Sequence, residues 1–209
     1  MDKSFAFKGT INPLKIINHP IETIENLKEK KNGSFYWATI ILALFTFSEI
    51  LLAVTKGFIF NTSRIEDFNL FMVLARSLFM VLLFVVANWA LCTLLDGEGR
   101  VLDIYISTCY CLIPLVVIRF VQAICSNLLT ADEYVFVGMV EICFNAWFVI
   151  LLLFALKTIH NYTLSKTIGN ALFTIVAMAI IFFIGFLFIV LVQQLYIFIA
   201  TVVTEIIMR

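Results

Sequence analysis

Five long runs of apolar residues constrain this chain more than any other feature. They cover about residues 36–55, 69–95, 103–129, 134–156 and 171–194 of a chain of 209 residues. An α-helix rises 1.5 Å per residue, so about 20 apolar residues cross the hydrocarbon core of a bilayer. The runs are continuous and do not alternate as the strands of a membrane barrel would. The sequence therefore predicts an all-α integral membrane protein in which residues 36–209 form a five-transmembrane-helix bundle.

Composition excludes other classes of protein. Hydrophobic residues make up 63% of the chain and charged residues 13%, about half the charged share of soluble domains. The 14 basic and 14 acidic side chains cancel, so no overall field attracts nucleic acid. We expect membrane lipid and other integral membrane proteins as partners, and no nucleic acid.

The fifth apolar run is too long for one untilted span. It begins near Ala171 and stays apolar almost to Arg209. We expect a break or bend near Gln193 and Gln194, which would leave residues 195–208 lying in the membrane interface or packed on the bundle. The sequence leaves open whether these residues instead continue the span.

Residues 1–35 are polar and charged and contain no signal-peptide core, so the first span is expected to act as the anchor. Within this segment, Pro20 occupies a helix start and Gly33 a helix stop. Ile21, Ile24 and Leu27 recur at helical spacing. We expect a short cytoplasmic N-terminal amphipathic helix, which serves either as a solvated collar that sets the topology or as a docking surface for a partner.

Basic residues outside the spans predict the orientation, because they gather on the cytoplasmic side. With five spans, nine basic residues fall on the side of the N-terminus and three on the other. The sequence therefore predicts a multi-pass protein of the cell inner (plasma) membrane with the N-terminus in the cytoplasm and the C-terminus outside. The nine are Lys3, Lys8, Lys15, Lys28, Lys30, Lys31, Arg100, Lys157 and Lys166, and the three are Lys56, Arg64 and Arg209.

Four ionisable residues lie inside the spans, where an isolated charge costs about 2.5–3.5 kcal/mol. They are Glu49, Arg76, Arg119 and Glu141. Helix rise places all four about 9–15 Å below the outer surface. The simplest arrangement pairs Glu49 with Arg76 and Glu141 with Arg119, with Gln122, Gln193 and Gln194 at a similar level.

This intramembrane charge cluster has three interpretations. Balanced charges favour structural pairs that fix the order and register of the helices. A polar cavity that binds a ligand or a partner is the second, and solute or proton transport is the third. The structural interpretation is the best supported of the three.

Two connections between spans carry polar residues. A tight cytoplasmic turn with internal salt bridges is predicted for Asp96, Gly97, Glu98, Gly99 and Arg100. With Asp103, its carboxylates could instead hold a divalent cation, but they lack the spacing of a calcium loop and Arg100 can neutralise them. The connection after the fourth span contains His160, which we expect to be a solvated interface residue. Five cysteines without a CxxC pair predict neither a zinc site nor disulfides, and we expect no metal and no cofactor.

Several stretches together resemble the Yip domain family of Ypt/Rab-interacting membrane proteins, and most of all its bacterial branch. They are HPIETIENLKEKKNGSFYW, VANWALCTLLDGEGR, DIYISTCYCLIPL and HNYTLSKTI. The resemblance covers about Asn12 to the C-terminus. It implies five spans, a cytoplasmic N-terminus and no known enzymatic activity.

Eukaryotic members of that family act as membrane receptors or scaffolds for small GTPases, and they carry a long polar N-terminal region that this sequence lacks. Bacterial members are often encoded near carbohydrate ABC importers, so the resemblance implies an accessory subunit of such an importer. The leading hypothesis is thus a non-enzymatic scaffold or accessory subunit that binds other integral membrane proteins. The alternative is a small transporter or channel with an outward-facing polar cavity around the intramembrane charges. The sequence contains neither HExxH nor GxSxG, which disfavours an enzyme.

Overall fold

The computed structural model describes residues 15–29, 34–55, 69–95 and 97–208, and the ordered elements in these ranges are helices. Five helical segments are long and apolar enough to span a membrane. The chain is therefore an all-α, multi-pass membrane protein, as the sequence predicts. The helices are α1 (Lys15–Asn18), α2 (Pro20–Glu29), α3 (Phe35–Thr55), α4 (Leu70–Leu94), α5 (Val101–Cys111), α6 (Ile113–Leu128), α7 (Ala131–His160) and α8 (Leu164–Ile207).

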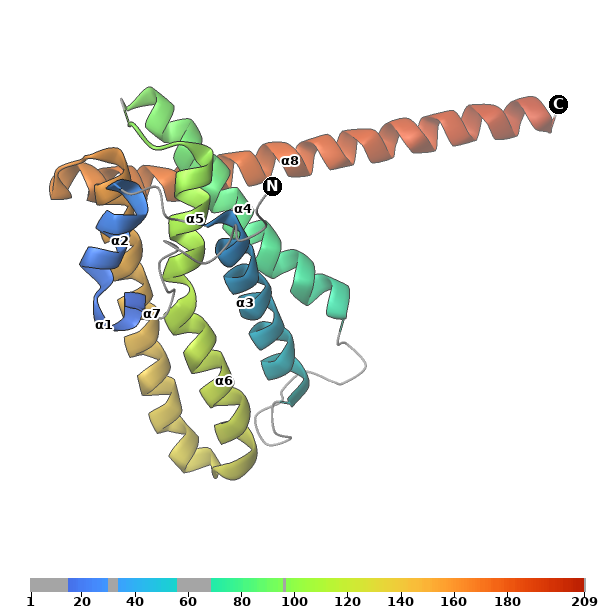
Figure 1. The fold of residues 1–209 in the computed structure, drawn as a ribbon. Coiled ribbons are helices and arrows are strands. Elements are labelled where there is room, and N and C mark those ends of the chain that lie inside the picture. The colour runs from blue at the N-terminus through green and yellow to red at the C-terminus, as the bar shows by residue number, and fades with distance from the viewer. Residues whose placement is uncertain (1–14, 30–33, 56–68, 96, 209) are drawn as a thin grey trace, which may run out of the picture.

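Helices α3, α5, α6 and α7 form the body of the bundle, and α4 lies against one side of it (Figure 1). The core is built from apolar side chains of α3, α4, α5 and α7, including the fully buried Ile104, Tyr110 and Leu151. Helix α2 packs beside the ends of α5 and α7. We refer to this end of the bundle as the α2 end and to the other as the far end.

The third predicted span consists of two helices. The first, α5, ends at Cys111, and α6 begins at Ile113 with Pro114 as its second residue. Proline has no N–H to bond the carbonyl one turn earlier, and its ring clashes with that carbonyl. The Leu112 N–H instead bonds the Cys109 carbonyl oxygen at 3.1 Å, three residues back. Pro114, at the centre of the predicted span, thus divides it into α5 and α6.

The N-terminal amphipathic helix lies on the bundle. Ile24 is buried and Leu27 packs against the core, while Ile21 stays exposed. The Lys28 ammonium donates to the Thr158 carbonyl oxygen and to Asn161 Oδ1, both at 2.7 Å. The positive charge of Lys28 therefore lies at the carboxyl end of α7, where it complements the dipole of that helix. Gly33, the predicted helix stop, lies outside the described residues.

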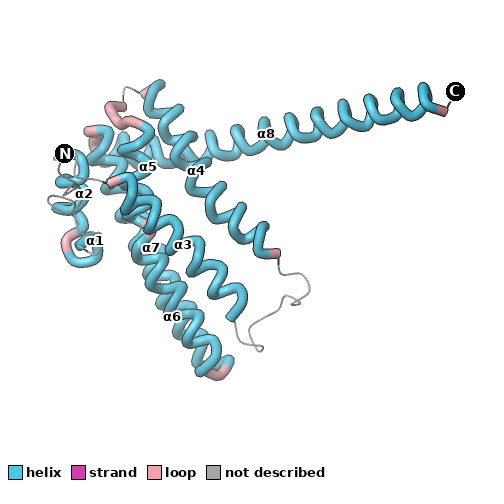
Figure 2. The backbone as a smooth tube through the Cα atoms, turned by 45° about the vertical axis from the view of Figure 1, so that its right-hand side comes forward, coloured by secondary structure: helices cyan, strands magenta, loops and turns pink. Residues whose placement is uncertain are grey.

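Helix α8 is one continuous helix of 44 residues. The predicted break near Gln193 and Gln194 is therefore wrong. The helix continues because residues 191–208 contain neither proline nor glycine. Its first turns pack against α4, and both views show the rest projecting across and away from the bundle (Figures 1 and 2).

Candidate functional site

The four intramembrane charges meet in the half of the bundle towards the far end. Arg119 stands at the centre, because its Nε donates to Glu49 Oε1 at 2.6 Å and its Nη1 donates to Glu141 Oε1 at 2.6 Å. Arg76 approaches Glu49 Oε2 at 3.5 Å. The charge cluster thus contains both pairs suggested by the sequence, together with a third contact, from Arg119 to Glu49.

Gln122 completes the charge cluster. It lies one helical turn after Arg119 on α6, accepts from Arg119 Nη1 at 3.0 Å and donates to Glu141 Oε2 at 2.6 Å. Every oxygen of Glu49 and Glu141 therefore contacts an arginine or Gln122. Gln193 and Gln194, expected at the same level, are instead exposed on α8.

The two arginines differ strongly in environment. The side chain of Arg119 is 20% exposed and joins α3, α6 and α7, whereas that of Arg76 is 70% exposed. A buried ion pair that loses one partner leaves an uncompensated charge, while an exposed pair contributes little. Arg119 is therefore the residue on which the charge cluster depends.

The turn between α4 and α5 is fixed against the end of α7. Glu98 lies 4.0 Å from Lys28 and accepts from the Asn161 side chain. Gly97 and Gly99 approach the His160 ring so closely that a Cβ on Gly99 would lie 2.4 Å from His160 Cε1. Glycine at both positions is therefore required by this close approach. Arg100 is exposed and precedes the first turn of α5, and Asp96 lies outside the described residues.

The prediction that His160 is solvated is wrong, because the residue is only 1% exposed. It ends α7, and Asn161 follows in a left-handed conformation (φ 54°) that turns the chain towards α8. This turn carries the imidazole under the α4–α5 connection instead of into water. Tyr162 stacks on its ring at 5.3 Å and donates to the Leu95 carbonyl oxygen.

His160 belongs to a second polar cluster, at the α2 end, which we call the imidazole cluster. Its Nε2 lies 3.1 Å from both Cys92 Sγ and Asn88 Oδ1. The Asn88 amide donates to Thr174 Oγ1 at 3.1 Å, and the Asn170 amide contacts Cys92 Sγ at 3.6 Å. The members are Asn88, Cys92, His160, Asn170 and Thr174, which all lie buried between α4, α7 and α8.

A thiol beside an imidazole can be a nucleophile with its base, but the hydrogen bonds here do not prepare that chemistry. The Gly99 N–H donates to His160 Nδ1 at 3.2 Å, so Nε2 carries the ring proton and donates to Asn88. An Nε2 that already holds a proton cannot take one from Cys92. Within the described residues, no three His, Cys, Asp or Glu side chains gather as metal ligands.

Comparison with known families supplies the wider relationship. The Yip1 domain family matches residues 14–189, which include both polar clusters and most of the chain. Searches of curated proteins and of solved structures found no match. The chain therefore belongs to the Yip1 domain family of membrane proteins.

Proposed function

We propose that this protein is a non-enzymatic integral membrane scaffold or accessory subunit, and that it binds another integral membrane protein through the distal part of α8. We define the distal arm as residues 183–207 of that helix. The observation that carries the proposal is that this arm has no neighbour within the described chain, since its side chains are almost all exposed.

Length and hydropathy make a lone arm unfavourable. Forty-four residues give a helix of about 66 Å, against about 30 Å of bilayer hydrocarbon. One straight span would need a tilt of about 60°, beyond the usual range of 0–40°. The helix is also strongly apolar and does not gather its few polar residues into a broad hydrophilic face, so it is poorly suited to water. A second membrane protein packed along the arm would cover it.

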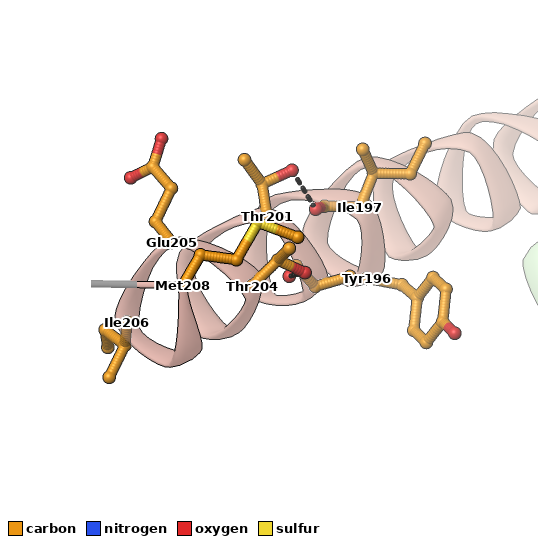
Figure 3. A pocket seen from close by; sticks show the side chains of 8 residues that line it. Tyr196, Ile197, Thr201, Thr204, Glu205, Ile206 and Met208 are labelled. Carbon is orange, nitrogen blue, oxygen red and sulfur yellow. Dashed lines mark hydrogen bonds between the residues drawn. The ribbon is translucent and has the colours of Figure 1, made fainter.

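The end of the arm carries a groove that is walled by α8 alone. This shallow groove contains the small residues Ala200, Thr201 and Thr204. It is also lined by Tyr196, Ile197, Glu205, Ile206 and Met208. Figure 3 shows that the side chains around this groove all come from the same helix. Helices in membranes associate where small residues allow backbones to approach. A helix of the partner would supply the second wall of the groove.

The finer proposal concerns the partner. Resemblance to the bacterial branch of the family suggests permeases of carbohydrate ABC importers. We also propose that the α2 end faces the cytoplasm, in the inner (plasma) membrane. The basic residues outside the spans support this orientation, because Lys28, Arg100, Lys157 and Lys166 all lie towards the α2 end.

A crosslinking experiment tests the proposal. A photo-crosslinking amino acid replaces Ala200 on the arm, and in a matched control it replaces Ile142, which is exposed on α7. In native membranes we expect Ala200 to give one dominant adduct with a different membrane protein, and Ile142 to give only lipid adducts. Lipid adducts alone at both positions would overturn the proposal, and an adduct of twice the chain mass would replace it with self-association.

The alternative, a small transporter or channel, has less support. Transport needs a polar path that joins the charge cluster to the α2 end. Thr46 and Ser77 lie buried between α3 and α4, but they bond each other and their own helix carbonyls. We expect no solute flux in proteoliposomes, and flux that Arg119→Leu abolishes would restore this alternative.

A further inference from the structure

The imidazole cluster lies where four parts of the chain meet. Asn88 and Cys92 come from α4, His160 from the end of α7, and Asn170 and Thr174 from the start of α8. The fourth part is the backbone of the α4–α5 turn, which reaches the ring through Gly99. The imidazole therefore links this turn to α4, and Asn88 and Cys92 of α4 in turn contact the start of α8.

Hydrogen bonding fixes the protonation state of that ring. Nδ1 accepts from the Gly99 N–H at 3.2 Å, so it bears no proton. Nε2 bears the proton and faces Asn88 Oδ1 at 3.1 Å. The ring occupies this position as a neutral imidazole with both nitrogens engaged.

A second proton has no place in this arrangement. It would have to bind Nδ1, where it would point at the Gly99 N–H, which is itself a donor. The ring cannot move aside towards the turn, because the Gly97 and Gly99 backbones already lie against it. The imidazolium form therefore requires the turn to separate from the ring.

Charged neighbours oppose the imidazolium as well. Lys28 of α2 bonds the Thr158 carbonyl and Asn161, on either side of His160. Lys166 of α8 lies 4.5 Å above Tyr162, which stacks on the imidazole. The other titratable or charged groups on these elements that are nearest in sequence to the residues around the ring are Cys92 on α4, Glu98 and Arg100 in the turn, and Lys157 on α7. Glu98 is exposed and already bound by Lys28 and Asn161.

We propose that His160 is an acid-sensitive latch, whose protonation breaks the bond to Gly99 and releases the α4–α5 turn from the end of α7. The neutral imidazole holds the closed state, and the imidazolium exists only in the open state. The latch thereby couples the proton concentration at the α2 end to the packing of the turn that joins α4 and α5. This inference stands whether or not the distal arm binds a partner.

The size of the effect follows from linkage. The pKa of a free imidazole is about 6.5. If only the open state takes up the proton, its population rises about 25-fold between pH 7 and pH 5. Opening uncovers Cys92, which is 1% exposed in the closed state.

Thiol labelling of the full chain in detergent micelles tests the latch. The probe is 4,4′-dithiodipyridine, which reacts with thiols in acid as well as at neutral pH. Cys143 is exposed and serves as the internal reference for the rate at each pH, while the buried Cys109 and Cys111 report general unfolding. Mass spectrometry of peptides distinguishes these sites.

The two histidines of the chain provide matched variants. We expect the rate at Cys92 relative to Cys143 to rise about 25-fold from pH 7 to pH 5, with Cys109 and Cys111 unlabelled. His19→Gln, an exposed position before α2, should retain the rise, and His160→Gln should abolish it. A flat profile in the unmodified protein overturns the latch, even if His160→Gln does not fold. A rise that persists in His160→Gln overturns it too.

Discussion

The charge cluster and the imidazole cluster each join helices of the bundle, towards opposite ends and with different chemistry. At the far end, Arg119 joins α3, α6 and α7 by ion pairs. At the α2 end, His160 joins α4, α7 and the α4–α5 turn by neutral hydrogen bonds. Helices in a membrane gain little from the hydrophobic effect, so polar contacts and close packing must fix their order. The comparison indicates that contacts made by ion pairs depend on the balance of positive and negative side chains, whereas contacts made by neutral hydrogen bonds depend on the close packing of the groups around them.

The largest effect is expected at the centre of the charge cluster. Arg119→Leu leaves Glu49 and Glu141 with only the exposed Arg76 to balance them, so the bundle should lose about 3–5 kcal/mol of stability. Thermal unfolding in detergent, or the yield of folded protein, measures the loss. A change below about 1 kcal/mol would mean that the carboxylates do not depend on Arg119.

The close fit of the imidazole cluster is tested by Gly99→Ala. The new Cβ would lie 2.4 Å from His160 Cε1 and 2.6 Å from Ile159 Cγ2, which forces the turn or the ring to move. We expect a loss of about 2–3 kcal/mol. Gly138→Ala on α7 is the matched control, because nothing lies within 4 Å of its added Cβ. Equal melting temperatures for the two variants would contradict the close fit.

Asn88→Ala removes the acceptor of the His160 Nε2–H and the donor to Thr174. The buried groups left without a partner should cost about 1–2 kcal/mol. Adding Thr174→Ala should then cost less than it does alone, because its main partner on α4 is already gone. Fully additive losses of stability would contradict an energetic coupling between Asn88 and Thr174, and so between the imidazole cluster and α8.

The smallest effect is expected for Arg76→Ala. Its guanidinium is 70% exposed and contacts Glu49 at 3.5 Å, a geometry worth about 0–1 kcal/mol. Such a small loss beside the large one for Arg119 would sharpen the contrast between a buried centre and an exposed edge. A loss as large as that of Arg119→Leu would show that charge count, and not burial, controls the charge cluster.

The sequence predicts the charge cluster better than the imidazole cluster for a physical reason. A charge in an apolar run stands out, and helix rise alone places Glu49, Arg76, Arg119 and Glu141 at similar depths. What periodicity cannot supply is which helices touch, so the contact between Arg119 and Glu49, across α3 and α6, goes unpredicted. Only packing reveals it.

The imidazole cluster gives no such signal. Asn, Cys, Thr and Gly are ordinary in membrane helices, and a histidine between Lys157 and Lys166 looks like a solvated loop residue. Its burial depends on the left-handed turn at Asn161 and on two glycines more than sixty residues earlier. The five spans are readable from apolar length alone, and the absence of proline and glycine from residues 191–208 also indicates the continuous α8.

The measurement that most directly tests whether the intramembrane charges are structural ties is the double variant Arg119→Leu with Glu141→Leu. The pair Glu49 and Arg76 then remains balanced, so the double variant should be more stable than Arg119→Leu alone by at least about 2 kcal/mol. This recovery is the expected signature of a scaffold whose charges hold helices together. A double variant no more stable than the single one would contradict the account and would favour a site that uses its carboxylates for a solute or a proton.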